Sequence, residues 1–233
     1  MSKIRILGID SSATPASAAV VEDGKILGEF FINTKLTHSQ TLMPMVKSVL
    51  EITDTTSPDL IAVTSGPGSF TGVRIGIASA KGLAFTEKIP CVGVSALTAL
   101  AYNFANNGAN SVICAVMDAR CGQVYNGLFQ LKNGEITRLC PDRTIAVTAL
   151  KEEVCRYGRS LVLVGDFAAK CHKTFQSFGA ELASEQSRYQ RASAVALAGI
   201  HEKWITAAQL QPVYLQLPQA QRELNKRMET KKN

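Results

Sequence analysis

Residues 60–76 read LIAVTSGPGSFTGVRIG, and this stretch decides the fold. An apolar strand at 60–63 enters a glycine-rich loop, a helix of small residues follows, and residues 89–94 form a second apolar strand. This order predicts a parallel βαβ unit. Ser69 or Thr71 would cap the helix through a side-chain oxygen, which leaves amide N–H groups at a positive helix end. The turn is therefore a candidate site for an anion or a polar partner.

The loop matches neither of the common phosphate-binding signatures. No Gly-Lys-Ser/Thr follows its glycines, and Thr71 stands where the third glycine of Gly-x-Gly-x-x-Gly would be. A tight strand-to-helix turn that binds nothing therefore stays open beside the anion site.

The composition indicates a globular protein of the cytoplasm. Of the 233 residues 46% are hydrophobic, no apolar run approaches the roughly 20 residues of a membrane span, and the N-terminus lacks a signal-peptide pattern. The six cysteines are widely spaced and form no Cys-x-x-Cys pair. We therefore expect buried thiols, with no zinc site and no membrane segment.

The net charge of +6 is unevenly distributed. Residues 222–232 carry five basic and two acidic side chains, so this tail supplies +3 and leaves the body only mildly basic. Because no aromatic residue is interleaved with these charges, we expect residues 222–233 to be a flexible, solubilising tail, with an RNA-binding arm as the alternative.

The chain before the βαβ unit predicts a β-meander and a helix. Residues 3–9, 16–22 and 26–32 alternate or run apolar between turn residues. Thr37 then begins a helix, and Gln40 three residues later would complete a capping box.

The same order of elements returns about 110 residues later. Asp118 follows Asp10 by 108 residues, at the end of the corresponding strand. Thr148 follows Thr37 by 111 residues, at the start of the corresponding helix. This internal duplication predicts two α/β lobes, of which the second is reduced. We place the lobes at residues 1–108 and 109–221, with a closing segment at about 193–217 that could pack back on the first lobe.

Several motifs together resemble those of a known family. They are the run at residues 66–76, ILGIDSS at residues 6–12, HSQ at 38–40, MDAR at 117–120 and VY at 124–125. The chain is identified on these motifs as a member of the bacterial TsaB, or YeaZ, family of tRNA threonylcarbamoyladenosine biosynthesis proteins. The duplicated layout likewise resembles the actin-like ATPase fold (ASKHA, ribonuclease H-like), here with a degenerate second lobe.

The resemblance implies a non-catalytic subunit. Such a subunit binds the catalytic subunit TsaD and supports threonylcarbamoyl transfer to adenosine 37 of tRNAs that read codons beginning with A, with the ATPase TsaE in the same assembly and tRNA bound indirectly. TsaD carries a His-x-x-x-His metal pair where residues 95–100 here read SALTAL. We expect no catalytic residue, no metal and no intrinsic cofactor, with ATP or ADP only in the assembled complex and a homodimer when the chain is alone. A stand-alone ATP-dependent kinase or hydrolase is the main alternative, and a direct tRNA-binding module is a third.

The resemblance also implies a helical interface. In the family, helices corresponding to residues 37–53 and 71–87 pack against the same helices of a second protein. A stripe of small residues recurs every four positions in the second helix, which would let a partner helix approach, although the domain's own sheet could fill the same role. The interface candidates are Thr37, His38, Leu42, Met45, Val46, Val49, Gly72, Val73, Gly76 and Ala80.

A cleft between the lobes is the second candidate site. In the actin-like fold an Asp at the end of the first strand of each half faces this cleft, and hard oxygen ligands suit Mg²⁺ on phosphates. An Asx or ST turn is the alternative role for Asp10. The candidates for an anion or nucleotide are Asp10, Ser11, Ser12, Gly66, Gly68, Ser69, Thr71, Arg74, Asp118 and Arg120.

Overall fold

A computed structural model describes residues 3–34, 36–105 and 108–216 of the chain. The expected tail at 222–233 and the end of the expected closing segment lie outside the described residues. Within the described residues, no helix is both long enough and apolar enough to cross a membrane.

The first lobe is a mixed five-stranded sheet in the order β3-β2-β1-β4-β5. β1, β2 and β3 are antiparallel neighbours, whereas β1, β4 and β5 are parallel, which confirms the predicted meander and βαβ unit. Its elements are β1 (Arg5–Asp10), β2 (Ala16–Glu22), β3 (Lys25–Ile32), α1 (His38–Ile52), β4 (Leu60–Gly66), α2 (Phe70–Glu87), β5 (Cys91–Ser95) and α3 (Ala96–Tyr102).

The second lobe repeats this plan with shorter helices. Its sheet has the order β11-β10-β6-β7-β8, in which β10 is parallel to β6 and β7 is antiparallel to β6 and β8. The repeated meander and crossover confirm the duplicated α/β fold. Its elements are β6 (Ser111–Asp118), β7 (Gln123–Lys132), β8 (Glu135–Arg138), β9 (Arg143–Ala146), α4 (Val147–Val154), η1 (Cys155–Ser160), β10 (Leu161–Val164), α5 (Ala168–Phe175), η2 (Gln176–Phe178), β11 (Glu181–Leu182), α6 (Glu185–Arg188) and α7 (Ala192–Gly199).

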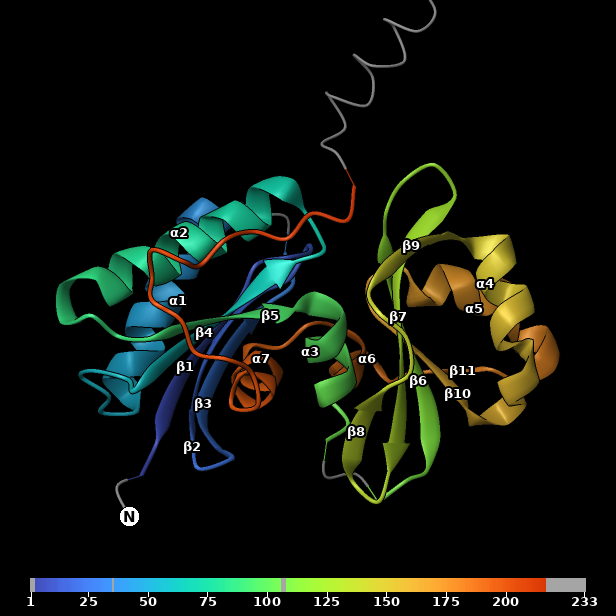
Figure 1. Cartoon of the computed structure of the whole chain (residues 1–233), viewed down its shortest axis with the longest axis horizontal. Coiled ribbons are helices and arrows are strands. Elements are labelled where there is room, and N and C mark those ends of the chain that lie inside the picture. The colour runs from blue at the N-terminus through green and yellow to red at the C-terminus, as the bar shows by residue number, and fades with distance from the viewer. Residues whose placement is uncertain (1–2, 35, 106–107, 217–233) are drawn as a thin grey trace, which may run out of the picture.

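The two sheets and the helices form alternating layers (Figure 1). Helices α1 and α2 cover the outer face of the first sheet, and α4 and α5 cover the outer face of the second. Between the sheets lie α3, which packs against β6 and β7, and α7, which packs against β1 and β2. α3 and α7 also contact each other, so they join the lobes through one central layer.

Side chains from the first sheet hold the start of α7. The Ala192 N–H donates to Ser17 Oγ at 2.9 Å, and the Ser193 N–H donates to Glu29 Oε1 at 3.0 Å. A carboxylate at this position also complements the positive end of the helix dipole. The C-terminal part of the chain therefore returns to the first lobe.

Two elements differ from the sequence-based prediction. The apolar residues from Ser193 to about Trp204 predict one helix, but α7 ends at Gly199, where the chain turns, and Ile205 then bridges to Cys91 at the edge of β5. Strand β9 was not predicted, since it follows Cys140 and Pro141 and gains its pairing only from β7.

The six cysteines differ in their exposure. Cys91, Cys114 and Cys171 are buried, Cys140 is half-buried, and Cys121 and Cys155 are exposed. The exposure of the last two contradicts the expectation of buried thiols.

Candidate functional site

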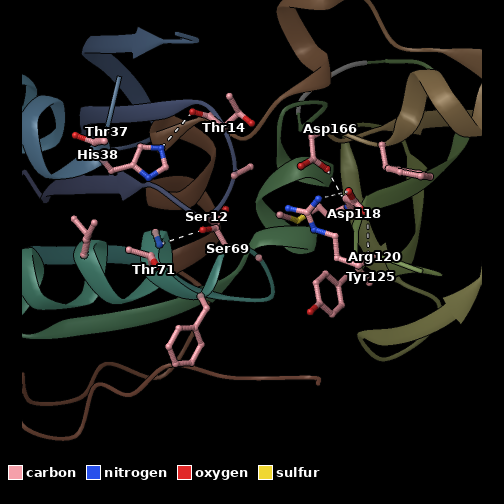
Figure 2. Close-up of a pocket in the computed structure, with 18 of the residues that line it drawn as sticks. Ser12, Thr14, Thr37, His38, Ser69, Thr71, Asp118, Arg120, Tyr125 and Asp166 are labelled. Atoms are coloured by element: carbon pink, nitrogen blue, oxygen red, sulfur yellow. Dashed lines mark hydrogen bonds and ion pairs between the residues drawn. The ribbon is translucent and has the colours of Figure 1, made fainter. Parts of the chain in front are cut away.

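A cleft of about 910 Å³ lies between the lobes, at the carboxyl ends of β1, β4 and β6. Six of the ten residues proposed from the sequence line it, namely Ser12, Gly68, Ser69, Thr71, Asp118 and Arg120. Thr37, His38 and Gly72, which the sequence assigned to a helical interface, line it too. Side chains from both lobes face this space (Figure 2).

The glycine-rich loop packs tightly before α2 begins. Ser69 is the N-cap: its Oγ accepts from the Gly72 N–H at 3.3 Å, so Ser69 rather than Thr71 caps the helix. The Ser69 N–H donates to Ser12 O at 2.7 Å, which ties the loop to the end of β1. Thr71 is exposed at the cleft.

Helix α1 also begins at the cleft, but without the expected capping box. Thr37 occupies the N-cap position and its side chain forms no capping hydrogen bond; its carbonyl accepts from the Gln40 N–H instead. His38 Nε2 lies 3.2 Å from the Thr14 carbonyl oxygen. The ring thus spans from α1 to the loop after β1, where Figure 2 shows it above the start of α2. Two helix N-termini therefore open onto the first-lobe wall.

Carboxylates form the second-lobe wall. The Asp118 N–H donates to Asp166 Oδ1 at 3.2 Å, and the Arg120 N–H donates to Asp118 Oδ1 at 2.8 Å. The Arg120 guanidinium also lies 3.6 Å from Asp118 Oδ2. Burial is the main reason why the pKa of Asp166 rises to about 6, with the neighbouring Asp118 charge adding to it.

Asp166 was not among the candidates from the sequence. It follows Gly165 after a buried strand, β10, so the strand-end rule that selected Asp118 could have found it. Lys170, in the first turn of α5, lines the same cleft, and its ammonium lies 4.7 Å from the ring centre of Phe167.

The expected pairing of Asp10 with Asp118 is wrong. Asp10 is completely buried; it accepts from the Ser12 N–H at 3.2 Å and from the hydroxyls of Ser12 and Thr64, and burial raises its pKa. Ser12, not Asp10, reaches the cleft lining. The Asx turn is therefore the role that the geometry supports for Asp10.

Three other residues proposed from the sequence for the cleft do not line it. Ser11 is buried and donates its hydroxyl to the Gly72 carbonyl at 2.9 Å. Gly66 lies against the backbone of Val213. Arg74 is not among the residues that line the cleft, and its Nε donates to Tyr214 Oη at 2.8 Å.

Most of the residues proposed for a helical interface are not available at the surface. The apolar residues of α1 lie in the lobe's own core, and so do the small residues of α2: Leu42, Met45, Val46, Val49, Gly72, Val73, Gly76 and Ala80 are all buried. A Cβ at Gly76 would lie 2.7 Å from Ser11 Oγ. The small-residue stripe therefore serves the close approach of α2 to the loop after β1. The outward side of the two helices carries exposed Met43, Ile52 and Phe85 instead.

The cleft can bind a polar ligand. Hydroxyls and helix N-termini on one wall can donate to an anion, while the Asp118 and Asp166 carboxylates opposite can accept from a hydroxyl or an ammonium group. Among the described residues, no group of three or more His, Cys, Asp or Glu side chains could hold a metal ion.

Comparisons with known proteins find similarity to a family model, to curated sequences and to solved structures. A family model described as "TsaD: tRNA N6-adenosine threonylcarbamoyltransferase" matches residues 25–219. The TsaB protein of Bacillus subtilis is 38% identical over 69% of this chain and 70% of its own length, and that of Escherichia coli is 41% identical over 54% and 55%. A solved Pseudomonas aeruginosa protein described as similar to the peptidase YeaZ superposes with a TM-score of 0.76 at 27% identity, covering 91% of this chain and 100% of that one.

Proposed function

The chain belongs to the TsaB family of tRNA threonylcarbamoyladenosine biosynthesis proteins, and from this premise we propose that it is the non-catalytic partner of a TsaD-type transferase. Its function lies in the biosynthesis of threonylcarbamoyladenosine in tRNA. In the proposed role it supports transfer of the threonylcarbamoyl group to adenosine 37 of tRNAs that read codons beginning with A. The observation that carries this proposal has two parts. A transferase family model matches residues 25–219, but the α3 helix of this chain holds mainly apolar side chains.

The start of α3 supports the non-catalytic assignment. Ser95 is the N-cap, and its Oγ accepts from the N–H groups of Leu97 and Thr98 at 3.2 and 3.3 Å. Leu97 and Leu100 are fully buried in the layer between the sheets. Side chains of this kind stabilise the core and cannot serve as ligands of a metal ion.

The outward side of α1 and α2 is the surface that we propose for the transferase. Three large apolar side chains are exposed there: Met43 at 41%, Ile52 at 74% and Phe85 at 82%. Both helices lie on the outside of the first lobe (Figure 1). Burial of these side chains against a partner helix pair would remove exposed apolar surface from water.

The same surface would form a homodimer when the transferase is absent, so the two assemblies should compete. In the full assembly the TsaE ATPase joins the complex, tRNA is bound mainly by the other subunits, and ATP or ADP enters only once the complex has formed. All of these partners belong to the cytoplasm.

The test is reconstitution. The chain, the TsaD-type subunit of the same organism and the two together are assayed, with the remaining pathway components supplied, for threonylcarbamoyladenosine in tRNA by mass spectrometry. We expect product only when both proteins are present. Product formed by this chain in the absence of a TsaD-type subunit would overturn the non-catalytic assignment.

The surface is tested by a matched pair of lysine substitutions. Phe85→Lys places a charge on the proposed surface, at the helix end where a cation is tolerated, and should weaken binding of the TsaD-type subunit. Leu139→Lys is the control, since Leu139 is also an exposed apolar residue (45%) but lies in the second lobe. Equal affinities of both variants, measured by calorimetry, would show that the transferase binds elsewhere.

A further inference from the structure

The last described segment of the chain, residues 211–216, crosses the mouth of the cleft. Figure 1 shows it as the orange-red trace that runs along α2 and then toward β7 and β9. Tyr214 and Gln216 both line the cleft. The segment therefore contacts the first lobe before it reaches the second.

Backbone contacts attach the segment to the first lobe. The Val213 N–H donates to Ser65 O at 2.8 Å. The Val213 carbonyl lies against Gly66, where a Cβ would come within 2.3 Å of its oxygen, so a side chain at residue 66 would push the segment away. Leu210, just before the segment, is buried in the core of the first lobe.

A stack of side chains adds a second attachment. The Tyr214 ring stacks on Phe70 with ring centres 5.0 Å apart, and the Arg74 guanidinium lies 4.0 Å from the centre of the Phe70 ring. The Arg74 Nε donates to Tyr214 Oη. Phe70 and Arg74 belong to the first turns of α2, so the stack fixes the segment beside the first-lobe wall of the cleft.

The contact with the second lobe is of a different kind. Gln216 Nε2 donates to Gln123 Oε1 at 3.0 Å. Gln123 closes the turn that carries the second-lobe cleft residues, since its N–H donates to Arg120 O and its carbonyl accepts from the Ala119 N–H. A hydrogen bond between two neutral amides adds little to stability, so it can break without unfolding either lobe.

A second hollow of about 710 Å³ lies at the opposite ends of the same strands. It is lined by the start of β1, by the turns between β2 and β3 and between β7 and β8, and by Trp204, which is 40% exposed. The cleft lies at the carboxyl ends of β1 and β6, with the central layer of α3 and α7 between the two hollows. A rotation of the lobes about this layer would widen one hollow as it narrows the other.

We propose that residues 211–216 form a strap that sets the opening of the cleft. Bound to both lobes, the strap holds the cleft at its present width. When the Gln216–Gln123 contact breaks, the lobes rotate about α3 and α7, the cleft widens and the hollow at Trp204 narrows. The strap thereby controls what size of polar ligand can enter the cleft, whichever partner the outer helices bind.

Three alanine variants of the full chain test the strap. Gln216→Ala removes the second-lobe contact, and Tyr214→Ala removes the stack on the first lobe. Gln211→Ala is the control, because Gln211 is exposed and its side chain has no hydrogen bond to either lobe within the described residues. Hydrogen exchange by mass spectrometry follows the amides of residues 69–73 and 119–123. Fluorescence follows the environment of Trp204, the one tryptophan of the sequence.

We expect Gln216→Ala and Tyr214→Ala to raise the exchange rate of the cleft amides roughly fivefold, and to shift Trp204 emission to shorter wavelength as its hollow narrows. Gln211→Ala should match the unmodified chain in both measurements. If Tyr214→Ala lowers the melting temperature, only the result for Gln216→Ala is used to test the strap, because the Gln216 side chain is not part of the hydrophobic core of either lobe. The strap would be refuted if, in Gln216→Ala, the cleft amides exchanged at the same rate as in the unmodified chain and the Trp204 emission did not shift.

Discussion

The Gly72→Ala substitution tests the inward packing of α2. An ideal Cβ at residue 72 would lie 2.1 Å from Ser11 O and 3.2 Å from His38 Nδ1. Because Ser11 O belongs to the backbone, α2 would have to move by about 1 Å to restore normal contact. That movement stretches the bond from the Ser69 N–H to Ser12 O and the bond from Ser11 Oγ to Gly72 O.

The two contributions to stability have opposite signs. Overpacking of this kind costs about 1 to 3 kcal/mol, whereas alanine in a helix is favoured over glycine by about 1 kcal/mol at most. Since the contact of 2.1 Å is with a backbone oxygen, we expect the upper part of this cost, about 2 to 3 kcal/mol, and therefore a net loss of about 1 to 2 kcal/mol in the free energy of unfolding. This loss corresponds to a fall of roughly 2 to 8 °C in Tm for a chain of this size. Gly82→Ala is the matched control in the same helix, since no atom lies within 4 Å of its added Cβ. It should raise stability by up to about 1 kcal/mol.

Urea unfolding followed by far-UV circular dichroism measures both variants. The midpoint should fall for Gly72→Ala and rise for Gly82→Ala, with unchanged slopes. If Gly72→Ala were as stable as Gly82→Ala, α2 would not pack closely on the loop after β1. The small-residue stripe would then be available to a partner helix after all.

Three further predictions concern polar groups that are buried or half-buried. Asp10→Ala removes the buried carboxylate that accepts from the hydroxyls of Ser12 and Thr64, and should lower the free energy of unfolding in urea by about 1 to 3 kcal/mol; an unchanged stability would return Asp10 to the list of cleft residues. Ser95→Ala removes the cap of α3 and the 2.5 Å bond to Asp142 Oδ2, and should cost about 0.5 to 2 kcal/mol by the same assay, whereas no loss would mean that other groups hold this junction. Burial raises the pKa of Asp166 from 3.8 to about 6, so the folded chain keeps this proton to higher pH than the unfolded chain, and its contribution to stability is lost as pH rises from 4 to above 6. The difference in unfolding free energy between the unmodified chain and Asp166→Asn should change over this range and level off above it; a constant difference would contradict the raised pKa.

Local patterns were sufficient for the elements and their order. The glycine loop, the alternating strands and the Asp-Gly and Asn-Gly turns at residues 23–24 and 133–134 act over a few residues, so they can be recognised in the sequence. The duplication follows from the same patterns, and the motifs around residues 66–76 led to the family. Strand β9 was not predicted because its formation depends on pairing with β7 rather than on a pattern in its own residues.

The candidate site was predicted only in part, because a motif does not show which of its groups are turned inward. Asp10 and Asp118 end equivalent strands. Asp10 is enclosed by Thr64 and Ser12, however, whereas Asp118 lines the cleft beside Asp166. The spacing of Gly72, Gly76 and Ala80 indicated a close approach correctly, but the approaching backbone is that of Ser11 in the same lobe.

The sequence by itself determined two α/β lobes of one family, a capped helix after a glycine loop, and carboxylates at strand ends, because turn chemistry and apolar periodicity are local. Only the tertiary structure decided that the Asp118 backbone meets Asp166, that the outward side of α1 and α2 carries Phe85, and that residues 211–216 bridge the lobes. Tyr214 and Arg74 are 140 residues apart in the chain. Contacts of this range depend on how the two sheets and the layer between them pack, and no short stretch of sequence records that packing.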